Sequence, residues 1–339
     1  MSEPVDYLTE ETYRPYWLED GVTEETIEAV VEEKPLLEEL AKELSGCERF
    51  YMVGSGGSYS VQLPIEYVAD KYTKVPVKVY SGWTFLDQRP AAVDGNTACV
   101  FISQSGKTKE IVEALDWCNE RGAVTLGLTQ KKESVINDKA SYGFGWDTRG
   151  VTLGKLGSLY ILFGSIFAEK SYEVGGRMVE TVLRLPEILP KMIPEAKETA
   201  RRHGLELKDH DEMFTLGGGI NWGLAYQYGF CTLMEMCWVH GTAVDYSEFR
   251  HGALEMFTEG TAAIFLRGRG GQRGLEEKIL EFSRGNGVKC VEYDSQGLDV
   301  DELATPFTLF IELEWLSYYL SLARNHRMGA WRFYDKVSF

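Results

Sequence analysis

The sequence predicts an α/β fold made of two tandem doubly wound, flavodoxin-like domains with parallel sheets, related to each other by internal duplication. Three observations predict this fold. Short apolar runs alternate with helical patterns from about residue 46 to residue 146, which is typical of βαβ units. The segment Tyr51 to Tyr59 recurs as Phe214 to Trp222, at a constant offset in residue number. The chain, at 339 residues, is long enough for two such domains.

The first elements of the chain precede the sheet. Residues 1–22 are aromatic and acidic without a clear period, and we expect them to form an arm. Thr23 begins a helix, Pro35 breaks it, and a second helix continues to about Leu44. Helical patterns also fill residues 154–206, which we expect to link the two domains.

Five strands and three intervening helices are expected in the first domain, because apolar runs this short suit strands buried between two helix layers. The strands are predicted at 48–53, 76–80, 97–102, 123–128 and 141–146. The helices are predicted near 58–71, 107–121 and 133–138. The expected domain boundaries are 1–45 for the arm and its helices, 46–172 for the first domain, 173–208 for the linking helix, and 209–339 for the second domain with its C-terminal helix and tail.

Charge and composition restrict the function classes. The net charge is −17, so a nucleic-acid backbone or an anionic membrane would be repelled. We find no apolar run of the roughly 18–20 residues that a membrane span needs, and the acidic start Met1-Ser2-Glu3 is unlike a signal peptide, so we expect a cytoplasmic protein. The six cysteines lack metal-ligand spacing and the density of a disulfide scaffold, which favours reduced packing residues and no metal.

The most informative turn is Ser103-Gln104-Ser105-Gly106-Lys107-Thr108, which lies between a strand pattern and a helical pattern. Hydroxyl side chains and the unpaired N–H groups of the helix start point at one spot in such a turn, where the helix dipole favours negative charge. The turn lacks the spacing of a Walker loop, so a single phosphomonoester is the expected ligand. The alternative is a helix cap without a ligand.

A second turn of this kind, Gly54 to Tyr59, follows the strand at 48–53. Its glycines allow close backbone approach, and Ser58 can cap the helix or contact an oxyanion. The second half has Gly-Gly-Ile-Asn and Arg-Gly-Arg-Gly at the matching turns, so we expect phosphate to bind the first half, at the carboxyl ends of its strands. Arg267 and Arg269 are either a second anion site or part of a solvated loop.

Two residues of the second half could transfer protons. Glu235 lies among Leu, Met, Cys and Trp residues, and desolvation there would raise its pKa and make it a usable base near neutral pH. A structural ion pair is the alternative for this carboxylate. His251 precedes a glycine and is either a proton donor or a surface histidine, whereas His240, in a more apolar stretch, is expected to be a core residue.

These motifs resemble those of a known family. The Gly-Gly-Ser-Tyr and Ser-Gln-Ser-Gly-x-Thr turns, the duplicated sheet, and the spacing between Glu235 and the pair His251-Gly252 are similar to the SIS (sugar isomerase) domain pair of glucosamine-6-phosphate synthase. The resemblance runs from about Arg49 to the C-terminus. It is closer still to the deglycases of phosphorylated Amadori compounds, of the fructoselysine-6-phosphate deglycase type, and the segments 235–251 and 314–321 carry this likeness.

The resemblance implies a role for each site residue. Glu235 falls on the general base and His251 on the general acid, with His251 completing the neighbouring subunit's site in a homodimer. Phosphate or substrate binding falls on Ser58, Ser103, Gln104, Ser105, Thr108, Lys155 and Glu248.

The chain departs from the synthase pattern around these residues. Thr232 and Met234 stand where the synthase has lysines, Ser247 replaces a glycine and Ala253 a proline, which disfavours the synthase activity. The resemblance therefore implies a deglycase that converts a fructosamine 6-phosphate, such as fructoselysine 6-phosphate, to glucose 6-phosphate and an amine, without a cofactor or metal. An aldose–ketose or aminosugar-phosphate isomerase and a non-catalytic sugar-phosphate regulator are the alternatives. The released amine, the sugar epimer and the role of Lys336 stay open.

Overall fold

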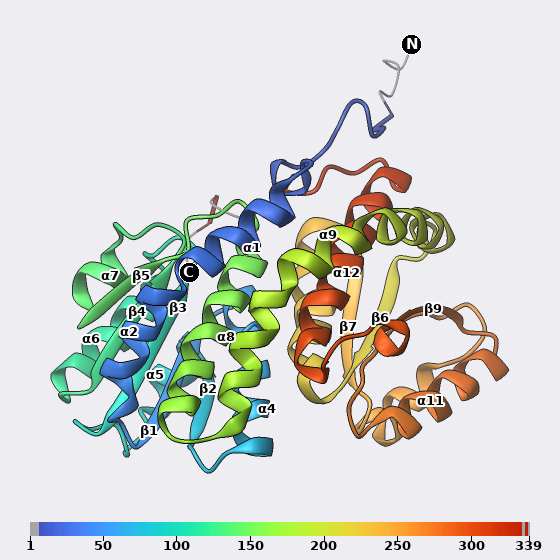
Figure 1. Cartoon of the computed structure of the whole chain (residues 1–339). Coiled ribbons are helices and arrows are strands. Elements are labelled where there is room, and N and C mark those ends of the chain that lie inside the picture. The colour runs from blue at the N-terminus through green and yellow to red at the C-terminus, as the bar shows by residue number, and fades with distance from the viewer. Residues whose placement is uncertain (1–6, 334–335, 338–339) are drawn as a thin grey trace. The chain divides into compact units, whose positions relative to one another are not determined.

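The computed structural model describes residues 7–333 and 336–337 (Figure 1). The chain forms two compact units. Asp20–Pro190 make up the N-terminal unit, and the described residues of Met1–Glu19 and Lys191–Phe339 make up the C-terminal unit. Each unit contains one parallel sheet, so the predicted α/β class with two parallel sheets is confirmed.

The N-terminal unit is built on five parallel strands in the order β2-β1-β3-β4-β5. A chain that places its first strand between its second and third has the topology of a doubly wound sheet. Each strand lies within one residue of its predicted bounds. The strands are β1 Arg49–Gly54, β2 Val77–Ser81, β3 Thr97–Ser103, β4 Val124–Thr129 and β5 Tyr142–Gly145.

Helices cover both faces of this sheet (Figure 1). Phe101 of β3 packs with Phe85 and Ile111 on one face. On the other face Phe50 of β1 contacts Phe163, with ring centroids 5.7 Å apart. The helices are α1 Val22–Glu32, α2 Lys34–Ser45, α3 Gly57–Ser60, α4 Leu63–Tyr72, α5 Gly82–Gln88, α6 Lys109–Glu120, α7 Val135–Lys139 and α8 Val151–Glu169.

Two local predictions for this unit were wrong. The single helix expected over 58–71 is two helices, α3 and α4, because Pro64 in the first turn of α4 suits a new helix start rather than a helix interior. Helix α8 is long and apolar enough to cross a membrane by length and composition, although we expected no such segment. Most of α8 is buried inside the protein, and a helix that is apolar all round is typical of a core.

The C-terminal unit repeats the same topology with four parallel strands in the order β7-β6-β8-β9. Strand β6 is the first strand of the second sheet, as β1 is of the first. In each sheet the first strand lies between the second and the third and pairs with both. This confirms the predicted internal duplication. The strands are β6 Glu212–Gly217, β7 His240–Asp245, β8 Ala262–Arg267 and β9 Lys289–Asp294.

The helices of the C-terminal unit include one uncommon element. The segment Gln227–Met236 is a π-helix that continues directly from α10 and leads into β7. Helix α9 contains the boundary between the two units, and α12 is a buried, apolar helix. The α-helices are α9 Glu173–Leu207, α10 Trp222–Tyr226, α11 Arg273–Gly285 and α12 Thr305–Ala323.

The expected core position of His240 is also wrong. His240 is the first residue of β7, the edge strand of its sheet, and its side chain is exposed. Its Nδ1 lies 3.2 Å from Oε1 of Glu212. The apolar residues just before His240 lie in the π-helix and in the connection 237–239, and they do not enclose its side chain. All six cysteines are free thiols, as expected.

Candidate functional site

The turn after β3 gathers three hydroxyl groups at the carboxyl edge of the N-terminal sheet. Ser103 Oγ lies 2.8 Å from Thr108 Oγ1 and 3.4 Å from Ser105 Oγ. Ser103 is almost fully buried, whereas Ser105 is exposed. Thr108 is the N-cap residue of α6, so the unpaired N–H groups of the first helical turn lie beside these hydroxyls. The cluster combines the donors and the helix dipole that suit a phosphate group.

Gly106 fixes the shape of this turn. Its φ angle is +66°, in the left-handed region that favours glycine. A Cβ atom at this position would lie 2.4 Å from Cβ of Ser134, so no larger residue fits. The Gly106 N–H donates to Ser103 Oγ over 3.2 Å, which holds the buried hydroxyl in place.

The turn after β1 adds a buried cation. Lys155, on α8, donates from Nζ to Ser58 Oγ over 3.3 Å, and both residues are buried. A buried ammonium group is costly unless anions or hydrogen-bond acceptors surround it, so this position favours a neighbouring anion. The sequence identified Lys155 only through the family resemblance.

The two turns are joined by a contact that we did not predict. Ser55 Oγ donates to Oε1 of Glu110, in the first turn of α6, over 2.8 Å. Strands β1 and β3 are direct neighbours in the sheet, so the turns that follow them lie at the same edge. The structure therefore brings the phosphate candidates of the N-terminal unit together around one edge. The exposed Gln104 lies at its rim, with Nε2 3.5 Å from Oε1 of Gln130.

Glu235 occupies the last turn of the π-helix and is partly buried. Burial raises the pKa of this carboxyl, and a hydrogen bond from the Trp331 side chain lowers it in part. In the described part of the chain Glu235 takes part in no ion pair, so the structural ion-pair alternative has no support there. Short π-helical segments occur often at functional sites.

His251 and Glu248 lie on the loop after β7. Phe249, between them, is buried and anchors the loop, whereas both candidates are exposed. The backbone N–H of His251 donates to the carbonyl oxygen of Glu248 over 2.9 Å. This places His251 and Glu248 in one exposed turn of the C-terminal unit.

The structure does not bring Glu235 and His251 of one chain together. Glu235 lies just before β7 and His251 just after it, so they flank opposite ends of this six-residue strand. A strand of this length spans about 17 Å at the usual rise of about 3.3 Å per residue. Within one chain the two residues therefore lie near opposite ends of β7.

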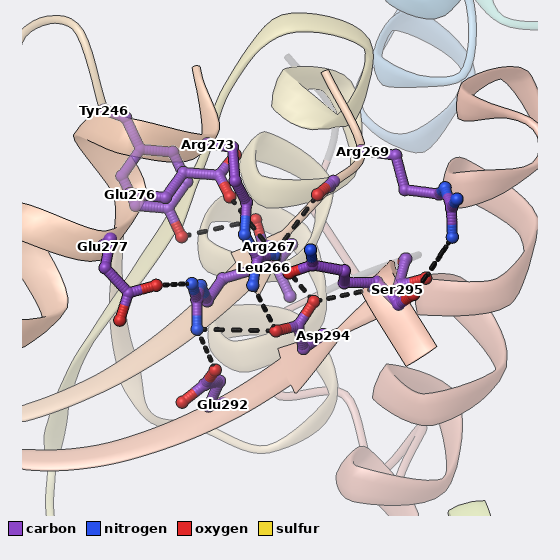
Figure 2. Close-up of polar contacts among 12 residues, drawn as sticks. Tyr246, Leu266, Arg267, Arg269, Arg273, Glu276, Glu277, Glu292, Asp294 and Ser295 are labelled. Carbon is purple, nitrogen blue, oxygen red and sulfur yellow. Dashed lines mark hydrogen bonds and ion pairs between the residues drawn. The ribbon is translucent and has the colours of Figure 1, made fainter. Parts of the chain in front are cut away.

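The second copy fills the matching turn with an internal ion cluster (Figure 2). Arg267 ends β8 as Ser103 ends β3, and it is almost fully buried. Its guanidinium pairs with Glu277 and Glu292 and lies 3.4 Å from Oδ2 of Asp294. Its positive charge is already neutralised by the chain's own carboxylates. Arg267 is therefore neither an anion site nor part of a solvated loop, whereas Arg269 of the same turn is exposed, as expected for a solvated loop.

Neighbouring residues complete this cluster. Arg273 pairs with Asp294 and lies 3.8 Å from Oε2 of Glu276. Burial raises the pKa of Glu276 to about 7, although the nearby arginines oppose this. Arg269 is exposed, and its Nη1 donates to backbone carbonyl oxygens of Ser295, Gln296 and Leu298.

Among the described residues, no group of three or more His, Cys, Asp or Glu side chains is arranged to hold a metal ion. Lys336 donates from Nζ to the backbone carbonyl oxygens of Trp331 and Arg332, each over 3.1 Å.

Comparisons with known proteins find relatives over most of the chain. Residues 43–151 match the family model of the SIS domain. This matched stretch of the chain contains β1, β3 and both hydroxyl turns. The chain is 27% identical over 320 residues to fructoselysine 6-phosphate deglycase of Escherichia coli O157:H7, with 93% of this chain and 94% of the relative covered. It is 28% identical over 304 residues to fructosamine deglycase FrlB of Bacillus subtilis, with 86% of this chain and 93% of the relative covered.

Solved structures share the fold over nearly the full length. A Bacillus subtilis protein described as a candidate phosphosugar isomerase matches with a TM-score of 0.82 and 26% identity, covering 92% of this chain and 99% of that one. The C-terminal domain of glucosamine-fructose-6-phosphate aminotransferase from Francisella tularensis matches with a TM-score of 0.81 and 18% identity, covering 95% and 99%. The second likeness shows the fold alone.

Proposed function

Because this chain is an SIS-domain protein related over nearly its whole length to fructosamine 6-phosphate deglycases, we propose that it is a phosphosugar deglycase. Its substrate would be a 6-phosphorylated Amadori compound such as fructoselysine 6-phosphate. Its products would be glucose 6-phosphate and the free amine. The observation that carries this proposal is the hydroxyl cluster after β3 beside the buried Lys155 and Ser58 pair.

The cluster suits a phosphate monoester on a sugar. Ser103, Ser105 and Thr108 would donate hydroxyl hydrogen bonds to the phosphate oxygens, and the start of α6 would add backbone donors. Lys155, next to Ser58, would supply the positive charge that a dianion needs in a protein of net charge −17. Binding energy from the phosphate would fix the sugar and reduce the entropic cost of the reaction.

The proposed chemistry uses two proton transfers and one water molecule. A base removes a proton from C1 of the open-chain ketosamine, which gives an enaminol. Protonation at C2 then gives the Schiff base of an aldose. Water adds to the C1=N bond, and the C1–N bond breaks to release the amine and glucose 6-phosphate. The route requires no redox step, so it needs no redox cofactor, and proton transfer alone activates the carbon.

Glu235 is the proposed base. Burial raises its pKa and so increases the proton affinity of the carboxylate, which suits a base that must act near neutral pH. His251 is the proposed proton donor for ring opening and for O2, with Glu248 beside it in the binding loop. The separation of the two residues along β7 favours a homodimer in which His251 completes the partner's site.

The remaining features fit an enzyme of small metabolites in the cytoplasm. The acidic chain offers no general attraction for nucleic acid or anionic lipid, so we propose a sugar phosphate as its partner. An aldose–ketose or aminosugar-phosphate isomerase is the second candidate. The solved structure described as a candidate phosphosugar isomerase, at 26% identity, favours keeping this alternative.

A product assay distinguishes the deglycase from the isomerase. The chain is incubated with fructoselysine 6-phosphate, and glucose 6-phosphate is followed by a coupled dehydrogenase. Glu235→Gln should lower turnover by about 100-fold or more with little change in substrate affinity, since the amide keeps the shape but accepts no proton. Glu259→Gln, an exposed carboxylate without an assigned role, is the matched control.

The outcomes of this assay are distinct. Release of glucose 6-phosphate and free lysine in equal amounts supports the deglycase. Interconversion of aldose and ketose phosphates without amine release supports the isomerase. Full activity of Glu235→Gln would remove Glu235 from the mechanism.

A further inference from the structure

Glu110 lies where the turns after three neighbouring strands of the N-terminal sheet meet. It is the second residue of α6, which follows β3, and its Oε1 accepts the hydrogen bond from Ser55 Oγ, in the turn after β1, over 2.8 Å. Gly82, the first residue after β2, packs against the same side chain, because a Cβ atom there would lie 2.3 Å from Cγ of Glu110. One side chain at the start of α6 therefore contacts the turns after β1 and β2.

An unbroken series of hydrogen bonds runs from Glu110 to the buried cation of the candidate site. Ser55 links Glu110 to the turn after β1, and the carbonyl oxygen of Ser55 accepts from the backbone N–H of Ser58 over 3.0 Å. Ser58 Oγ in turn accepts from Nζ of Lys155 over 3.3 Å. A displacement of Ser55 would therefore disturb the side chains that lie beside the proposed phosphate.

Glu110 also belongs to the helix start that carries the hydroxyl cluster. Thr108, two residues earlier, is the N-cap residue of α6, and its Oγ1 lies 2.8 Å from Ser103 Oγ. Side chains two positions apart on a helix do not face each other, and the Glu110 carboxylate is directed toward the turn after β1 instead. Its position suits a brace between the two turns rather than a ligand of the phosphate.

We propose that Glu110 is a positioning residue for phosphate binding: its hydrogen bond with Ser55 holds the turn after β1 in place relative to the hydroxyl turn after β3. This inference rests on the proposed function, in which both turns contact one phosphate group. Two loops that share one small anion bind it tightly when they are already ordered, because binding does not then have to supply the cost of ordering them. Glu110 acts through Ser55 and not on the substrate.

The first test separates the hydrogen bond from the charge. Glu110→Ala removes the acceptor, whereas Glu110→Gln keeps an acceptor oxygen for Ser55 and removes the negative charge. In calorimetric titrations with glucose 6-phosphate, Glu110→Ala should raise Kd about tenfold, and Glu110→Gln should stay within about twofold of the unmodified chain. Glu113→Ala, which removes an exposed carboxylate from the same helix, is the matched control and should leave Kd unchanged. A purely structural role for Glu110 would lower the melting temperature and leave Kd unchanged well below that temperature.

A double-mutant cycle tests the route through Ser55. Ser55→Ala should weaken binding about as much as Glu110→Ala, and the double variant should bind no more weakly than either single variant, because both changes break the same hydrogen bond. If Glu110→Ala does not fold, Ser55→Ala provides the same test, with Ser55→Thr, which keeps a hydroxyl, as the variant that should restore affinity.

The outcomes separate this inference from the proposed function. Additive losses in the cycle, an unchanged Kd in Glu110→Ala, or a Glu110→Gln variant as weak as Glu110→Ala would overturn the inference and leave the phosphate site in place. Coupled losses in a chain that binds glucose 6-phosphate but releases no amine from fructoselysine 6-phosphate would support the inference and reject the deglycase. An unmodified chain that binds no glucose 6-phosphate would reject both.

Discussion

Removal of the Ser103 and Ser105 hydroxyls tests where the phosphate binds. In the double variant Ser103→Ala with Ser105→Ala, the turn after β3 keeps Thr108 and the N–H groups of α6 but loses two of its three clustered hydroxyls. A hydrogen bond to a charged group contributes about 1.5–3 kcal/mol, and two that share one ligand are not fully additive. Ser105 is exposed, so its contribution to the binding free energy belongs at the lower end of this range.

We therefore expect a loss of about 2–4 kcal/mol in binding free energy, or a rise in Kd of roughly 30-fold to 1,000-fold. Isothermal titration calorimetry with glucose 6-phosphate measures it directly. The loss should be much smaller for glucose, which carries no phosphate. Ser283→Ala, which removes a buried hydroxyl bonded to the carbonyl oxygen of Ile279, is the matched control for the chemical change.

Stability must be measured alongside affinity. Ser103→Ala leaves the buried Gly106 N–H without its acceptor, which costs about 1–3 kcal/mol of folding free energy. Affinity is therefore compared well below the melting temperature of the variant. An unchanged Kd for glucose 6-phosphate in a folded double variant would refute the assignment of the phosphate to this turn.

Three further predictions address other parts of the chain. Mixing inactive Glu235→Gln and His251→Asn subunits should restore about a quarter of the activity, because half of randomly formed dimers would hold one intact shared site; no recovery after verified subunit exchange would place both residues in one chain's site. Glu276→Gln should gain stability relative to the unmodified chain as pH rises from about 4.5 to about 7, since a carboxyl whose folded pKa is raised to about 7 is favoured in its neutral form. Parallel urea titrations at pH 5 and pH 8 measure the free energy of unfolding of both chains. The same stability difference between the two chains at both pH values would contradict this prediction. Gly106→Ala should destabilise the chain by roughly 1–3 kcal/mol through a strained φ and a contact with Ser134, and weaken phosphate binding; wild-type melting and affinity would show that the turn adapts.

The strands and their duplication could be predicted because each leaves a local signal. Buried parallel strands are short apolar runs, and the constant offset between the copies appears directly in the sequence around Gly54 and Gly217. The hydroxyl groups after β3 could be predicted from the sequence in the same way, since a turn between a strand and a helix fixes where they lie. These features depend on neighbours within a few residues.

Features that depend on distant contacts could not be predicted. Ser55 donates to Glu110 from far along the sequence, and nothing near either residue indicates the pair. The exposure of His240 follows from the place of β7 at the edge of its sheet, a property of the assembled topology. The sequence of the π-helix predicts an ordinary helix, because its apolar pattern differs little from an α-helical one over so short a segment.

The ion cluster of the second copy makes the difference between the two halves hard to reverse. A change of Arg267 to serine would recreate the hydroxyl of the first copy, but it would leave Glu277, Glu292 and Asp294 without their shared cation. Arg273 would still pair with Asp294 and Arg284 with Glu292, but Glu277 would lose its cation, and the excess negative charge of the turn would oppose a phosphate. Further substitutions among these carboxylates would be needed before the turn could accept a phosphate. A single substitution therefore does not restore a phosphate site in the second copy, because the carboxylates that pair with Arg267 would have to change with it.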